Sequence, residues 1–112
     1  TTYKLKNLKP YSTEVLEILG LNEEEGRSLY LETWINRKYE YDQFVEWKEQ
    51  QTPIQKFVNV SDQYGRKIDG NDNCVTNFFF YGGSTTFGYN VTDYQTIPAF
   101  FKNIILMHHM TK

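Results

Sequence analysis

One segment has residues of the kind that bind calcium. Residues 69–73 read Asp-Gly-Asn-Asp-Asn and supply the oxygen ligands that Ca²⁺ prefers. An EF-hand loop starting at Asp69 would need Gly at its sixth position and Glu at its twelfth. Those positions hold Cys74 and Phe80, so the sharp turn and the bidentate carboxylate are both missing. Because Asn and Asp are common in turns for conformational reasons alone, the sequence predicts no calcium site.

The two histidines are neighbours near the end of a predicted helix. His108 and His109 would point about 100° apart, whereas helical zinc sites use positions i and i+4. A protonated histidine near a helix C-terminus is stabilised by the helix dipole, which is the simpler interpretation. The sequence therefore predicts no structural metal and no cofactor.

Two residues are candidate nucleophiles, Cys74 and Ser84. A partner histidine would meet Cys74 only in the folded chain, so spacing does not exclude a catalytic pair. Neither residue lies in a nucleophile elbow, and residues 82–85 lack the Lys of a phosphate-binding loop. The single cysteine forms no internal disulfide and is interpreted as a small apolar core residue. The chain is predicted not to be an enzyme, and a small uncharacterised enzyme is kept as the third alternative.

Composition predicts one globular domain, residues 1–112. A chain of this length buries about two-thirds of its unfolded surface, enough for an independent core. The net charge of −2 disfavours a strongly basic nucleic-acid face, although it allows a local basic strip. No run approaches the ~18 apolar residues of a membrane span, and the N-terminus carries no signal-peptide core. We expect a cytoplasmic protein without a membrane partner.

The two halves of the sequence predict an α+β fold. Residues 1–56 carry 18 charged groups and every Glu, whereas residues 57–112 carry eight charged groups and 11 of the 19 aromatic residues. Glu and Lys suit helix surfaces and aromatic residues suit strands. We expect an antiparallel sheet of four or five strands, packed with about three helices in a compact pair of layers.

Capping and periodicity locate the predicted elements. A helix over 13–19 has Ser12 or Thr13 as N-cap and Gly20 as its left-handed end, and a last helix over 97–110 has Thr96 as N-cap. Gly26 is expected to cut short a helical turn that begins after Asn22. The other predicted elements are a strand over 29–36, a helix over 40–51, short strands over 56–60 and 66–68 around a turn at 62–65, and a hairpin of 74–81 with 85–91.

The aromatic run from Phe78 to Tyr81 is the most informative feature. Consecutive rings place aromatic side chains on both faces of the predicted strand, although a sheet covered on one face needs only alternate apolar positions. The surplus is covered by the last helix, by another subunit or by a ligand. Exposed rings can also stack on RNA bases, but the consensus of the common RNA-binding sheet is absent. Core or oligomer packing is favoured over base stacking.

Strand parity selects rings that should face away from the core and form a contact surface: Trp34, Tyr30, Phe79 and Tyr81. Tyr64 of the predicted turn is included with them. A basic patch could accompany them, formed by Lys56, Arg66, Lys67, Arg37 and Lys38. We expect a small non-catalytic binding or regulatory protein that acts through this aromatic surface on another protein, with self-association allowed. The alternative is an RNA-binding regulator that uses the same rings and cations.

Overall fold

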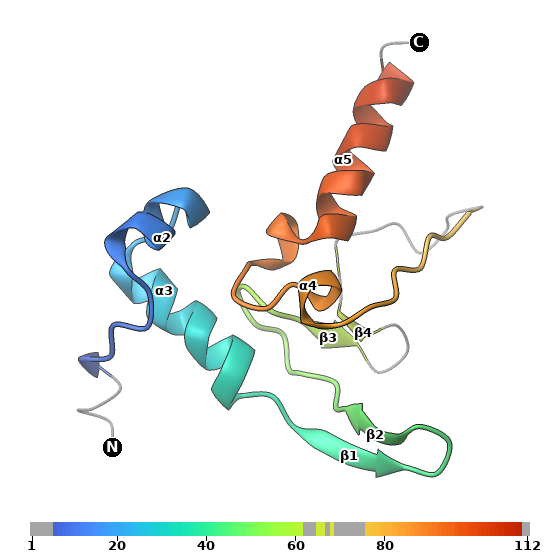
Figure 1. Cartoon of the computed structure of the whole chain (residues 1–112), viewed down its shortest axis with the longest axis horizontal. Helices are drawn as coiled ribbons and strands as arrows, with labels where there is room; N and C mark the ends of the chain where they lie inside the picture. The colour runs from blue at the N-terminus through green and yellow to red at the C-terminus, as the bar shows by residue number, and fades with distance from the viewer. Residues whose placement is uncertain (1–5, 62–64, 67, 69–75, 111–112) are drawn as a thin grey trace.

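The computed structural model describes residues 6–61, 65–66, 68 and 76–110 of the chain. It is a mixed α+β structure with about three main helices and two separate two-stranded antiparallel sheets (Figure 1). The radius of gyration is 16.0 Å, against about 13 Å for a compact domain of this length. The α+β class is confirmed, but the predicted single sheet in a compact pair of layers is wrong. The elements are α2 (Thr13–Leu19), α3 (Glu23–Tyr30), η1 (Leu31–Ile35), β1 (Tyr39–Asp42), β2 (Glu46–Glu49), β3 (Val60–Ser61), β4 (Gly65–Arg66), α4 (Ser84–Phe87), η2 (Asp93–Gln95) and α5 (Ile97–Met110).

The first and last predicted helices are confirmed at their predicted bounds. In α2 the side chain of Ser12 accepts a hydrogen bond from the Val15 N–H, and Gly20 ends the helix with φ of 70°. In α5 the hydroxyl of Thr96 accepts from the Ala99 N–H. Both helices follow from local signals that need no distant partner.

The strand predicted over 29–36 is wrong, because these residues continue a helix. Asn22 and Glu25 form a capping box at the start of α3, which runs through Gly26 and on into the π-helical turn η1. Gly26 is buried, and a Cβ there would lie 2.6 Å from Leu16 Cδ2. Gly26 therefore lets α2 and α3 pack closely and does not end the helix.

The helix predicted over 40–51 is also wrong. These residues form the β1–β2 hairpin, in which Tyr41 faces Trp47 and their rings meet edge to face at 6.0 Å. The Asp42 carboxylate accepts hydrogen bonds from the N–H groups of Phe44 and Val45 and closes the turn. These two bonds hold the pKa of Asp42 below its ordinary value.

Of the strands predicted over 56–60 and 66–68, only Val60 and Arg66 lie in a described strand, and 56–59 form none. β3 and β4 pair antiparallel, with Val60 opposite Arg66 and Ser61 opposite Gly65. The rest of the predicted turn, residues 62–64, and Lys67 lie outside the described residues. So do the calcium candidate 69–73 and Cys74.

The predicted hairpin of 74–81 with 85–91 is wrong. Residues 76–81 form no strand, and Ser84–Phe87 is the short helix α4. Gly88 then takes φ of 82°, which few other residues adopt, and a Cβ there would lie 2.9 Å from Thr96 Cγ2. The chain turns at Gly88 and passes close to the start of α5 instead of running on as a strand.

The hydrophobic core is small. Leu29, Phe57 and Val58 form its buried centre, with Tyr11, Leu19 and Leu21 packed against it. Several buried residues are polar or charged, among them Glu32, Thr33, Asp93 and Thr96. No helix in the described part of the chain has the length and apolarity needed to cross a membrane.

Candidate functional site

An apolar stripe runs along α5, the helix that projects from the body of the molecule (Figure 1). Its members are spaced i, i+3, i+7 and i+10, so they share one face of the helix. All four are exposed large apolar side chains: Ile97 at 49 %, Phe100 at 56 %, Ile104 at 65 % and Met107 at 67 %. We call them the α5 stripe.

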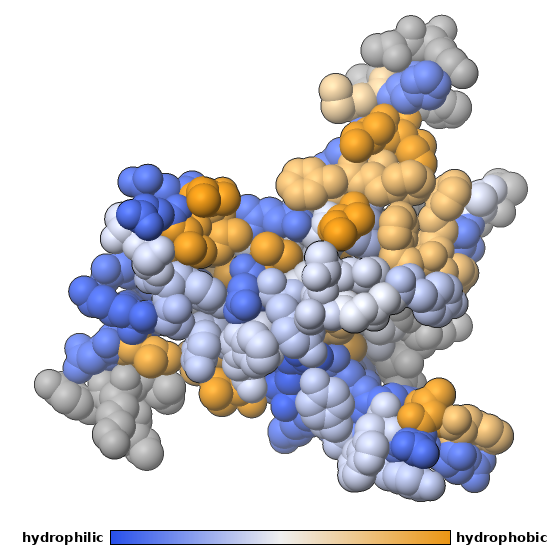
Figure 2. All heavy atoms as spheres, viewed as in Figure 1, coloured by the Kyte–Doolittle hydropathy of each residue, from blue (hydrophilic) through white to orange (hydrophobic). Residues whose placement is uncertain are grey.

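The aromatic run lies against the same helix. Phe101 of α5 packs edge to face on Phe78 and Phe80, with ring centres 5.2 and 5.3 Å apart. Phe79 and Tyr81 remain 58 % and 88 % exposed. We call Phe78, Phe79, Phe80 and Tyr81 together with the α5 stripe the α5 surface. Figure 2 shows hydrophobic atoms gathered along the projecting helix and beside its base.

The α5 surface belongs to a nearly uncharged stretch of sequence. The sequence from 76 to 110 has one acidic residue, Asp93, one lysine, Lys102, and no arginine. Asp93 is buried, so it contributes no charge at the surface. A neutral apolar surface favours an apolar partner, since it offers nothing to neutralise phosphates.

Two predicted contact residues, Trp34 and Tyr30, lie on η1 and α3, and Trp34 lines one groove together with Ile97 at the start of α5. Trp34 is 46 % exposed at the end of η1, where its Nε1–H donates to Asn90 Oδ1 at 2.7 Å and its ring meets Tyr89 at 5.1 Å. Tyr30 is half-buried at the end of α3, edge to face with Tyr11. The structure thus brings Phe79 and Tyr81 to α5 and leaves Trp34 and Tyr30 on α3 and η1. Tyr64 lies outside the described residues.

An open groove of about 520 Å³ lies beside Trp34, between α4 and the start of α5. Its lining carries no charged side chain and includes Tyr89, Asn90, Gln95 and Thr96. Gln95 and Thr96 are already hydrogen bonded within the protein. The side-chain oxygen Oδ1 of Asn90 accepts hydrogen bonds from both Trp34 and Tyr11. These bonds tie η1 and the N-terminal segment to the loop before α5, and leave few polar atoms for a ligand.

Arg37 of the predicted basic patch is buried and pairs with Glu49. Its guanidinium donates to both carboxylate oxygens of Glu49, and it lies 4.5 and 4.6 Å from the ring centres of Phe87 and Tyr89. The Arg37 side chain is 6 % exposed. Burial lowers the pKa of Arg37, but the hydrogen bonds to Glu49 and Tyr89 outweigh it, so the pKa lies above its ordinary value.

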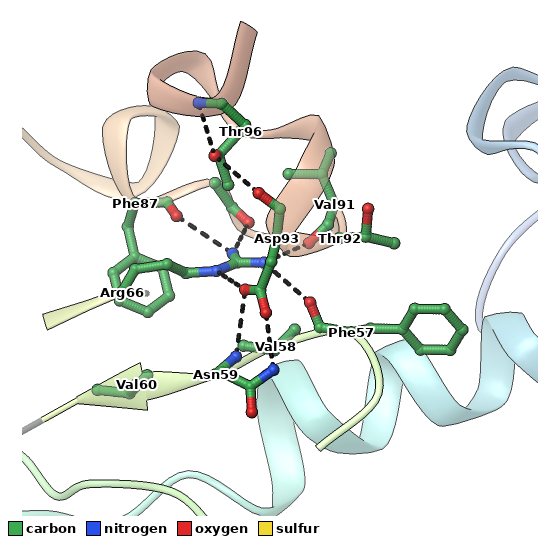
Figure 3. A network of polar contacts seen from close by, with 12 residues as sticks. Phe57, Val58, Asn59, Val60, Arg66, Phe87, Val91, Thr92, Asp93 and Thr96 are labelled. Carbon is green, nitrogen blue, oxygen red and sulfur yellow. Dashed lines mark hydrogen bonds and ion pairs between the residues drawn. The ribbon is translucent and has the colours of Figure 1, made fainter. Parts of the chain in front are cut away.

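Arg66 is also buried, in the network of polar contacts drawn in Figure 3, which we call the junction. Its guanidinium donates to Asp93 Oδ1 at 3.0 Å and to the carbonyl oxygens of Phe87, Gly88 and Val91. The two charged side chains are 6 % and 11 % exposed. Burial lowers the pKa of Arg66, and the bond to Asp93 opposes that effect. Arg66 therefore joins β4 to the loop before α5.

The remaining cations form no extended basic face in the described part of the chain. Lys56 pairs with Glu25 at 3.2 Å and lies 5.0 Å from the centre of the Phe57 ring. Lys38 is exposed, and Lys67 lies outside the described residues. Of the five cations predicted as a patch, the structure shows two at the surface, Lys38 and Lys56.

The exposed stripe on α5 was not among the contact residues predicted from sequence. No contact site was predicted on this helix. Its exposed apolar residues are nevertheless three, four and three positions apart, a spacing typical of helix–helix seams: Ile97, Phe100, Ile104 and Met107. Exposure could not be inferred from that spacing, because a buried helix face has the same pattern. No known protein family, curated protein or solved structure matches the chain.

Proposed function

We propose that this protein is a non-catalytic binding module that docks on another protein through the α5 surface. The observation that carries the proposal is the α5 stripe, four large apolar side chains on one face of a projecting helix. Soluble chains seldom leave such a continuous apolar area uncovered unless it is a contact site. The partner chemistry that fits it is a second apolar helix face, because a 3-4-3 seam packs knobs into the holes of another helix.

The same observations favour a protein partner over RNA. Exposed rings such as Phe79 and Tyr81 could stack on bases, but that mode also uses a positively charged groove along the backbone. Arg37 and Arg66 are committed to Glu49 and Asp93. RNA binding is therefore an outcome that the test must detect.

A photo-crosslinking group at position 100 tests the proposal. Benzoylphenylalanine replaces Phe100 in one protein and Phe44, which is 86 % exposed at the hairpin turn, in a matched control. We expect a discrete protein adduct, identified by mass spectrometry, from position 100 and none from position 44. The adduct should disappear with Ile104→Asp and persist with Ile54→Asp, whose parent side chain is fully exposed in the segment between β2 and β3.

Two results contradict the proposal. A nuclease-sensitive adduct from position 100 would show a nucleic-acid partner at the α5 surface. Equal adducts from positions 44 and 100, or none from either, would show that the α5 surface has no preferred protein partner.

A further inference from the structure

We propose that the partner on the α5 surface is a second copy of this chain, paired through antiparallel α5 helices. The inference rests on the proposed function and names its partner. Three observations carry it: the surface area of the chain, the symmetry of the α5 stripe and the place of Lys102 on α5.

The chain exposes more surface than a compact protein of its size. Its accessible area is 8983 Å², about 2,500 Å² more than the scaling law gives for this mass. A standard interface buries about 800 Å² on each partner, and obligate dimers bury more. The α5 stripe, whose four side chains are 49–67 % exposed, is part of this area.

The α5 stripe is complementary to itself when two copies run in opposite directions. A two-fold axis that crosses α5 near its middle places Ile97 opposite Met107 of the second copy. The same axis places Phe100 opposite Ile104 of the second copy. Each residue then gives and receives the same contact, as an isologous interface requires. All four members of the stripe are used, and none is left facing a gap.

Charge placement permits this pairing. Lys102 is the one Lys, Arg, Asp or Glu on α5. At 100° per residue it lies on the side of the helix opposite the middle of the stripe, so the seam contains no like-charge contact. Antiparallel helices also oppose their dipoles, whereas parallel ones align them.

Surroundings at the base of α5 fit the same arrangement. The tip of the second copy's helix, at Met107, reaches the first turns of α5, where Phe101 carries Phe78 and Phe80. Exposed Phe79 and Tyr81 lie in that segment and extend the apolar area available to the arriving helix.

Sedimentation equilibrium of the purified full chain tests the self-pairing. We expect a dimer that dissociates on dilution. For Ile104→Asp the dissociation constant should be at least about 30-fold higher, as for removal of a hot-spot contact. Ile54→Asp is the matched control and should leave the dimer unchanged. Met107→Lys, at the tip of the helix where a cation suits the dipole, gives a second interface variant should Ile104→Asp lose the fold.

Disulfide trapping tests the direction of the helices. In a Cys74→Ser background, one protein carries Ile97→Cys and another carries Met107→Cys. Mixing the two should give mainly the mixed disulfide if the helices are antiparallel. Preferential trapping of like with like would overturn the antiparallel arrangement.

The failure of self-pairing differs from the failure of the proposed function. A folded chain that stays monomeric at every concentration overturns the self-pairing. An identified adduct with a different protein at position 100 would still support docking through the α5 surface. A monomer without any specific adduct overturns both proposals.

Discussion

Two regions of the molecule differ from the usual pattern of charged residues outside and large apolar residues inside. The junction around Arg66 buries charges, and the α5 surface exposes large apolar side chains. At the junction, charged side chains are 6–11 % exposed and bind backbone groups from distant segments. The four members of the α5 stripe are large apolar side chains that are 49–67 % exposed. The ion pair of Arg66 with Asp93 therefore joins segments that are distant in the sequence, whereas the α5 stripe remains at the surface.

A second buried carboxylate extends the same principle. Glu32 accepts hydrogen bonds from the backbone N–H groups of Lys56, Phe57 and Val58, at 3.1, 2.7 and 2.8 Å. Asn59 continues the run, with its own N–H and its side-chain amide donating to Asp93. The segment 56–59 has no strand partner, so these carboxylates satisfy N–H groups that a sheet would otherwise pair.

Removing the Asp93 carboxylate should have the largest effect on stability. Asp93→Ala leaves the Arg66 guanidinium buried without its counter-charge, which costs about 3–5 kcal/mol in the free energy of unfolding. Chemical denaturation measures it. The control is Glu23→Ala, which removes the exposed pair of Glu23 with Lys9 and should cost less than about 1 kcal/mol. Equal small losses from both variants would show that the junction does not stabilise the fold.

Glu32→Ala should destabilise the protein by a smaller amount, about 2–3 kcal/mol. It leaves backbone N–H groups without acceptors, but no buried cation loses its partner. Glu24→Ala, at an exposed position in α3, is the control and should cost at most about 1 kcal/mol through the helix dipole. Denaturation midpoints of the two variants that coincide would contradict the role of Glu32.

Alkaline pH tests the contact of Tyr11, whose hydroxyl donates to Asn90 Oδ1 at 2.8 Å. Burial, and then the nearby Tyr30, raises the pKa of Tyr11 to about 12, above the unfolded value near 10. The folded protein therefore favours the neutral phenol, and its contribution to stability is lost as pH rises from 10 towards 12. Because Tyr11 is half-exposed, solvent screening limits the loss to about 1 kcal/mol. Tyr11→Phe should show a smaller fall in stability over this pH range, and an identical fall in both proteins would refute the assignment.

Tyr81→Ala should have the smallest effect on stability, less than about 0.5 kcal/mol, because the side chain is 88 % exposed. Leu29→Ala, at a fully buried core position, should cost about 2–5 kcal/mol and gives the scale. Dimer association should nevertheless weaken in Tyr81→Ala. A loss of stability comparable with that of Leu29→Ala would mean that Tyr81 is core and that the α5 surface is misassigned.

Local signals predicted the elements whose stability is local. Ser12, Gly20 and Thr96 mark the ends of α2 and α5 through contacts within four residues, so the sequence alone located both helices. Residues 29–36 were predicted as a strand because apolar and polar residues alternate there, but the side chains that the fold buries do not follow that alternation. The residues buried there are Leu29, Glu32 and Thr33, at helical spacing, and two of them are polar.

The contact surface was predicted only in part. Exposure of Phe79 and Tyr81 was expected from strand parity, yet they are exposed in a segment that forms no strand. Spacing in the sequence could not show which cations of the predicted patch are buried. Arg66 finds its acceptors 9–27 residues away, and Arg37 finds Glu49 12 residues away. Such partners are chosen by the fold, and no local pattern encodes them.

The long reach of Arg66 has a consequence for the order in which the chain folds. Closing the 27-residue loop between Arg66 and Asp93 costs about 3 kcal/mol of chain entropy before any bond repays it. Helices α2 and α3 and the β1–β2 hairpin need no such closure. We expect the junction to form after the folding transition state, so that Asp93→Ala mainly speeds unfolding; an equal slowing of refolding would contradict this. Because α5 begins four residues after Asp93, we expect the helix that carries the α5 stripe to be anchored last.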